Sequence, residues 1–183
     1  MTGSELKIQV LQRALDAAEK GYEENTQIAV LLEDKAQKSA TITGVLLAAG
    51  LTFVKKETFG PLAARFSVPF VEAIVALTVA LLLLTIALCV FVLWLRERPS
   101  LPVADVTHMA LQMNLSSEGE LDESAYVRFL NDCVDLWPRV LERQKGIIIS
   151  KSKQMLWAHI ALSVSFVLIG SLVILSMEAT KRG

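Results

Sequence analysis

The stretch AIVALTVALLLLTIALCVFVLWL, residues 73–95, decides the fold. Its 23 consecutive residues carry no charge, and the charged run Arg-Glu-Arg-Pro follows at residues 96–99. An α-helix rises about 1.5 Å per residue, so this stretch can cross the roughly 30 Å of hydrocarbon in a bilayer. A core helix of a water-soluble protein is rarely apolar for so many consecutive positions. The stretch therefore predicts a transmembrane helix over about residues 71–95.

A second apolar stretch near the C-terminus, residues 156–177, predicts another transmembrane helix within the segment 155–183. His159 is its only ionisable residue, and Trp157 stands where an aromatic residue at the membrane–water interface is expected. We interpret His159 as a residue at headgroup level rather than as a ligand or a proton site.

The third apolar segment, residues 39–55, is shorter and contains several threonines and glycines. It either crosses the membrane, with flanking lysines extending its usable length, or enters the membrane and returns. Ala40, Gly44 and Ala48 recur every four residues, a pattern that allows another helix to approach closely, and Gly170 offers a similar small-residue site in the last span. We therefore predict a spanning helix that depends on packing against its neighbours.

Composition agrees with these spans and excludes two classes of protein. Hydrophobic residues make up 53% of the 183 residues, which excludes an intrinsically disordered chain. The isoelectric point of about 6.1 excludes a basic nucleic-acid-binding protein. The sequence predicts an all-α integral membrane protein with three transmembrane helices, an N-terminal amphipathic helix and a small helical cytosolic lobe. The expected parts are residues 1–38 (amphipathic helix), 39–99 (transmembrane hairpin), 100–154 (cytosolic helical segment) and 155–183 (third span and tail).

The distribution of lysine and arginine predicts the orientation. Thirteen of these residues lie in the N-terminal and middle segments, whereas five lie in the first connector and the tail. Basic residues accumulate on the cytoplasmic side, so we expect a multi-pass protein of the inner membrane with a cytoplasmic N-terminus. The first 38 residues are charged and lack the apolar core of a signal peptide, so we expect them to be retained.

The N-terminal segment predicts one long helix, because apolar residues follow alternating steps of three and four positions. The stripe consists of Ile8, Leu11, Leu15, Ala18, Tyr22, Asn25, Ala29, Leu32 and Ala36. Asn25 is a polar interruption of the kind that fixes register, and Gly21 could mark a break. The stripe packs either on the middle segment of its own chain or on a second copy of the chain, and the sequence favours neither.

The middle segment predicts a short helix over residues 103–113, a loop, and a long helix from about Asp122. An apolar face with three/four spacing includes Tyr126, Cys133 and Trp137. Pro138 lacks a backbone donor and is expected to kink or break this helix. A helix continuous with the last span would act as a lever between the cytosolic part and the membrane.

The sequence contains no motif of a known catalytic site, and we expect a protein without catalytic residues, metal or cofactor. Its two histidines lie in different segments. Cys89 falls within a span and Cys133 on the apolar face of the middle helix, where both are expected as small core residues rather than as a disulfide pair.

Two short stretches resemble small transmembrane effectors of bacterial anti-phage defence, of the Pycsar type and the related SLATT-like groups. The first is Glu33-Asp34-Lys35-Ala36, which leads directly into the span beginning at Thr41. The second is the lysine-bearing helix that re-enters the membrane, residues 151–162. The resemblance implies an effector that forms a homo-oligomer and disrupts the inner membrane during abortive infection. It also implies a trigger, either a second messenger made by a nucleotide cyclase or a defence partner protein.

The resemblance makes a cyclic nucleotide a possible ligand, and one group of residues is the candidate site. It consists of Tyr126, Trp137, Arg139, Arg143 and Lys145. Core packing and cytoplasmic positive charge explain the same residues without a ligand. Two other functional classes fit the sequence: a membrane anchor that recruits a cytosolic partner, and a small channel or transporter subunit.

Overall fold

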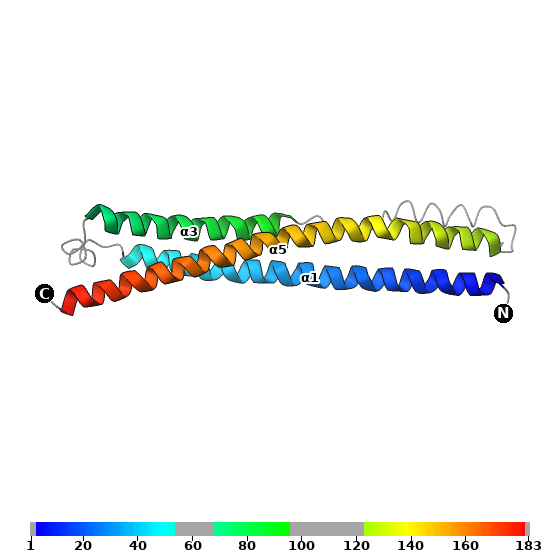
Figure 1. Ribbon diagram of the computed structural model, residues 1–183, viewed down its shortest axis with the longest axis horizontal. Helices are drawn as coiled ribbons and strands as arrows, with labels where there is room; N and C mark the ends of the chain where they lie inside the picture. Colours follow the sequence, from blue (N-terminus) through cyan, green and yellow to red (C-terminus); the bar gives the residue numbers. More distant parts are fainter. Residues whose placement is uncertain (1–2, 54–67, 96–122, 182–183) are drawn as a thin grey trace. The chain divides into compact units, whose positions relative to one another are not determined.

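The computed structural model describes residues 3–53, 68–95 and 123–181, and these residues form three α-helices. They are α1 (Gly3–Phe53), α3 (Val68–Trp94) and α5 (Glu123–Lys181) (Figure 1). The predicted all-α class is confirmed for the described residues. The predicted helix over residues 103–113 and the basic residues of both connectors lie outside the described residues.

Both long helices are continuous where the sequence suggested interruptions. α1 passes through Gly21 and continues from the predicted N-terminal helix into the predicted first span without a break. α5 begins at Glu123, close to the expected start. It continues through Pro138, so the prediction that the helix could break there was wrong. Pro138 is exposed, so water can bind the carbonyl that its ring deprives of a donor, while Trp137 and Val140 remain buried on the opposite side.

The chain divides into two compact units, and α1 and α5 contribute residues to each. The first unit combines Met1–Val30 with Glu97–Ile149, and the second combines Leu31–Arg96 with Ser150–Gly183. These boundaries lie a few residues before the ends of the predicted soluble segments at residues 38 and 154.

In the first unit, α1 and α5 run in the same direction and contact each other along the predicted stripe. Ile8, Leu11, Leu15, Ala18, Tyr22, Asn25 and Ala29 are all partly buried, whereas most residues between them are exposed. α5 contributes the buried side chains of Leu130, Cys133, Trp137 and Val140. Leu6, Val10 and Ile28 are exposed outside the stripe, so α1 also carries apolar side chains on its other faces.

In the second unit, α3 lies beside α1 and α5 and runs antiparallel to them (Figure 1). Its core consists of the buried residues Ala36, Cys89, Val92, Met155 and Ala158, with Leu32, Ala40, Leu88 and Leu93 packed against them. The stripe predicted for α1 thus continues into this unit through Leu32 and Ala36.

The side chains buried between the helices of the second unit are mostly small. Besides Cys89, Ala158 and Ala161, they include five hydroxyl residues: Ser39, Thr43, Thr78, Thr85 and Ser165. In the last four, the hydroxyl donates a hydrogen bond of 2.7–2.9 Å to the carbonyl four residues earlier in its own helix. These four are therefore satisfied without a partner on another helix, and their small size allows the helices to approach each other closely.

Large apolar side chains lie on the outside of this unit. Exposed residues include Ile42, Leu77, Leu84, Phe91, Val167 and Ile174. α3 and the stretch Ser124–Glu178 of α5 are both long and apolar enough to cross a membrane. Only 22% and 11% of their most apolar windows are buried within the chain, whereas a core helix of a soluble protein is mostly buried. Residues 39–53 of α1 are also helical, and their crossing of the membrane stays a prediction.

The small-residue core gives a first prediction. Ala158 is fully buried, so Ala158→Leu overpacks the contact with Ala36 and Val92 and should lower the free energy of unfolding by about 1–3 kcal/mol. The same substitution at the exposed Ala76 should change it by less than about 0.5 kcal/mol. Unfolding in detergent micelles measures both variants, and equal losses would contradict the proposed packing.

Candidate functional site: a buried ion pair between α1 and α5

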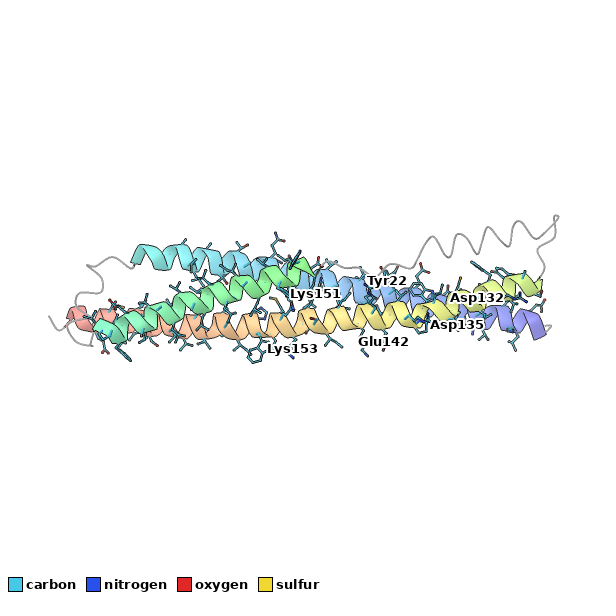
Figure 2. The ribbon with its side chains drawn as sticks, turned by 90° about the horizontal axis from the view of Figure 1, so that it is seen from above. Tyr22, Asp132, Asp135, Glu142, Lys151 and Lys153 are labelled. Atoms are coloured by element: carbon cyan, nitrogen blue, oxygen red, sulfur yellow. The ribbon has the colours of Figure 1, made fainter. Side chains whose placement is uncertain are left out.

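The most distinctive polar feature of the second unit is a buried ion pair between its two parallel helices. Lys151 Nζ on α5 lies 2.6 Å from Glu33 Oε1 on α1. The Lys151 side chain is 2% exposed and the Glu33 side chain 19%. Figure 2 shows Lys151 on the side of α5 that faces α1, and Lys153 on the opposite side.

Local sequence explains why these two charges meet. Glu33 adjoins Leu32 and Ala36 on the inner face of α1, and Lys151 lies one turn before Met155 on the inner face of α5. Residues three and four apart share a helix face, so each charge points in the same direction as an apolar core residue. The pair therefore lies at the edge of the core cluster.

The energetics of such a pair favour specificity over stability. Removing one partner from a buried pair typically costs about 3–5 kcal/mol, because the other charge stays buried without compensation. Replacing both partners with apolar residues is often neutral or stabilising. The pair is therefore suited to selecting one register of α5 against α1. A shift by one residue would separate Lys151 from Glu33 and leave the charges without each other.

A second polar contact in the same unit follows farther along both helices. The Ser39 Oγ and His159 Nε2 atoms are 3.4 Å apart. Ser39 is buried, whereas His159 is exposed, and the position of His159 at headgroup level stays a prediction.

The first unit has its own buried polar contact between the same helices. Gln144 Nε2 donates to Thr26 Oγ1 at 2.9 Å and to the Tyr22 carbonyl at 3.3 Å. Gln144 Oε1 is buried and has no hydrogen-bond partner among the described residues. Next to this contact, the rings of Tyr22 and Trp137 meet edge to face, with centroids 5.8 Å apart.

The residues predicted as a nucleotide site are not gathered in one place. Trp137 is buried against Tyr22, and Tyr126 is partly buried and accepts a hydrogen bond from Gln12 Nε2 at 3.2 Å. Arg139, Arg143 and Lys145 are exposed. Trp137 and Arg139 differ by two positions and hence by about 200° around the helix, so they lie on different faces of α5, whereas Arg139 and Arg143 differ by four positions and share a face. Nucleotide binding stays a prediction.

The residues predicted from the family resemblance and from small-residue spacing have different environments. Glu33 forms the ion pair, Lys35 is exposed, and Ala36 is fully buried in the core cluster. Ala40 packs against that cluster, whereas Ala48 is exposed. At Gly44 and Gly170, a Cβ atom would meet no described atom within 4 Å, so the close approach expected there does not occur within the described chain.

The two cysteines are free and buried, as predicted. Cys133 lies in the first unit, where burial and, to a smaller extent, the adjacent Asp132 carboxylate raise the pKa of its thiol. A protonated, buried thiol is a poor nucleophile. Within the described residues, no three histidine, cysteine or acidic side chains lie close enough together to hold a metal ion.

Sequence reasoning identified Glu33 and Lys151 in separate motifs but did not pair them. Lys151 continues the three/four spacing of its helix, and Glu33 directly follows the stripe residue Leu32, positions where a charge calls for a partner. That signal was available in the sequence. The parallel alignment of α1 and α5 that brings the two residues together was not.

Comparison of the chain with models of protein families, with curated proteins and with solved structures found no match.

The ion pair yields a second prediction. Glu33→Met should lower the free energy of unfolding by about 3 kcal/mol, because the Lys151 ammonium is 2% exposed and loses the carboxylate that compensates it. Lys151→Met should cost less, because the Glu33 side chain is 19% exposed. The double variant should recover most of this loss. A double-mutant cycle from unfolding in detergent micelles measures the coupling.

The matched control is Lys38 with Asp34, a pair of the same length whose side chains are 70% and 49% exposed. The same cycle there should give a coupling below about 1 kcal/mol. Additive losses at Lys151 and Glu33 would show that the two side chains do not depend on each other.

Proposed function

We propose that this chain is a signal-responsive membrane effector, in which α1 and α5 transmit a change in the polar first unit to the apolar second unit. The observation that carries the proposal is that both helices contribute, without interruption, to both units. An anchor needs only a single apolar segment. Two continuous parallel helices joined by a buried ion pair can instead shift from one alignment to another as a rigid unit. No catalytic step is part of the proposal.

The membrane placement behind this proposal rests on where apolar side chains lie. Large apolar side chains surround the second unit. Their exposure to water would be strongly unfavourable, and lipid around them removes that exposure. Residues 39–50 of α1 belong to the same unit, with Ser39 and Thr43 buried in it, which supports a third crossing beside α3 and α5. Three crossings and the basic N-terminal region together support a multi-pass protein with its N-terminus in the cytoplasm.

The resemblance of residues 33–36 and 151–162 to anti-phage effectors supports a more specific role. In this role, a second messenger or a partner protein acts on the first unit, copies of the chain assemble, and the bacterial inner membrane is disrupted in abortive infection. The open positions at Gly44 and Gly170 support assembly, because they leave room for a helix of another copy. The ligand contributes only if it binds the assembled state more tightly than the resting state.

Topology gives a third prediction. In a background with Cys89→Ala and Cys133→Ala, single cysteines replace the exposed residues Glu23 and Glu178. With three crossings, a membrane-impermeant thiol reagent should label position 178 in intact cells and position 23 only after permeabilisation. Labelling of both positions only after permeabilisation would instead indicate two crossings.

Coupling gives the fourth prediction and tests the function itself. Seven residues are inserted in both α1, between Val30 and Leu31, and α5, between Ile149 and Ser150, so that helix phase is preserved. One variant receives helix-forming heptads and the other receives flexible glycine–serine heptads of equal length. The chains are expressed in bacteria with a membrane-potential dye while candidate cyclic nucleotides are supplied.

The effector proposal expects a signal to depolarise cells that carry the natural chain or the helical insertion, and to spare cells that carry the flexible insertion. Equal depolarisation by both insertions would exclude transmission through the helices. An unchanged potential with every signal, despite correct membrane insertion, would favour the anchor that recruits a cytosolic partner.

A further inference from the structure

The charged residues of the second unit gather at its two ends. One end carries Lys35, Lys38, Lys151 and Lys153 together with Glu33 and Asp34. The described part of the other end carries Glu72, Glu178 and Lys181. Residues 39–53, 73–94 and 154–177 lie between these ends and contain no Asp, Glu, Lys or Arg. The second unit therefore has an uncharged middle between two charged ends, and the end that carries Lys35, Lys38, Lys151 and Lys153 is called the basic end.

Packing in the core cluster places the residues of the basic end at similar heights along the helix axes. Ala36, Val92, Met155 and Ala158 pack together. Lys35 adjoins Ala36, Trp94 follows Val92 by two residues, and Lys153 and Trp157 flank Met155 at a distance of two residues. Each is within about one helical turn, or roughly 5 Å along the axis, of a member of the cluster.

The charges at this end are partly neutralised within the unit. Lys151 is buried against Glu33, and Lys38 pairs with Asp34 at 2.6 Å. Lys35 on α1 and Lys153 on α5 are exposed, and neither forms an ion pair with a described residue. Among the described residues, four lysines against two carboxylates leave a net charge of +2 at the basic end.

Two indole rings accompany this charge. Trp94 is 80% exposed and Trp157 54% exposed, and both lie at the border of the uncharged middle. Tryptophan is enriched at membrane–water interfaces because its ring is largely apolar and its N–H group is polar. A soluble anion would account for the lysines, but it would leave the two exposed rings without a role.

We propose that the basic end of the second unit is a binding surface for anionic phospholipid headgroups, with Lys35 and Lys153 contacting the phosphates and Trp94 and Trp157 lying among the headgroups. The inference rests on the membrane placement given under the proposed function and adds a lipid class to it. Basic residues beside an apolar segment attract anionic lipid by about 1 kcal/mol each near the surface, which corresponds to about a fivefold enrichment per lysine.

Tryptophan quenching by brominated lipid tests the surface. The chain has three tryptophans, and Trp137→Phe leaves the two at the basic end as reporters. The protein is placed in vesicles of phosphatidylcholine and phosphatidylglycerol at equal amounts, with bromine on the acyl chains of one lipid or of the other. Brominated phosphatidylglycerol should quench more strongly, and the difference should shrink near 1 M salt, where the Debye length falls to about 3 Å.

The double variant Lys35→Gln/Lys153→Gln should lose most of this preference. The matched control Lys7→Gln/Lys20→Gln removes two exposed lysines of α1 from the first unit and should keep it. Measurements on the chain with Trp137 intact serve as a second readout, because Trp137 is buried and adds a constant background.

Each outcome has a separate meaning. Equal quenching by both lipids, or a preference that survives the loss of Lys35 and Lys153, would overturn the lipid proposal and leave the effector proposal standing. An absence of quenching by either lipid would show that the basic end does not lie at a bilayer and would overturn both.

Discussion

The packing of the second unit depends on a division of side chains by size. Small side chains such as Thr85, Cys89 and Ala158 are buried between the helices together with a few larger ones such as Leu82 and Val92, whereas many leucine, isoleucine, valine and phenylalanine side chains are exposed. In water, the hydrophobic effect drives the opposite distribution. In lipid, no hydrophobic force separates large from small apolar residues, and association depends on close backbone approach. The observed division therefore suits a surrounding of hydrocarbon.

Within that packing, the ion pair of Lys151 and Glu33 discriminates between helix registers, which contacts between small residues do not. Contacts between alanine, serine and threonine are similar along the length of a helix, so they discriminate weakly between neighbouring registers. A buried charge has one acceptable partner, and every other alignment leaves it uncompensated. One such pair can therefore fix the alignment of two helices whose remaining contacts are nearly uniform, at some cost in stability.

Sequence periodicity predicted the helices and the buried stripe of α1 because both are local properties. Positions three and four apart share a face whatever the tertiary structure, so Leu11, Leu15 and Tyr22 were placed correctly on the inner side. The continuity of α5 through Pro138 was not predicted, because the loss of one hydrogen bond is offset by tertiary packing of Trp137 and Val140. The partner of Lys151 was not predicted either, since the alignment of α1 with α5 is set across more than a hundred residues of sequence.

Under the proposed function, a change in the first unit reaches the second through α1 and α5. A rotation of α5 by a few tens of degrees would carry Trp137 away from Tyr22 in one unit and Lys151 away from Glu33 in the other, because all four residues lie on helices without a described break. The aromatic contact loses little in such a movement, whereas the buried Lys151 ammonium loses the compensation that Glu33 provides. Such a movement would therefore cost most at the ion pair. Under the proposed function, the binding energy of a signal would have to offset the separation of those two charges.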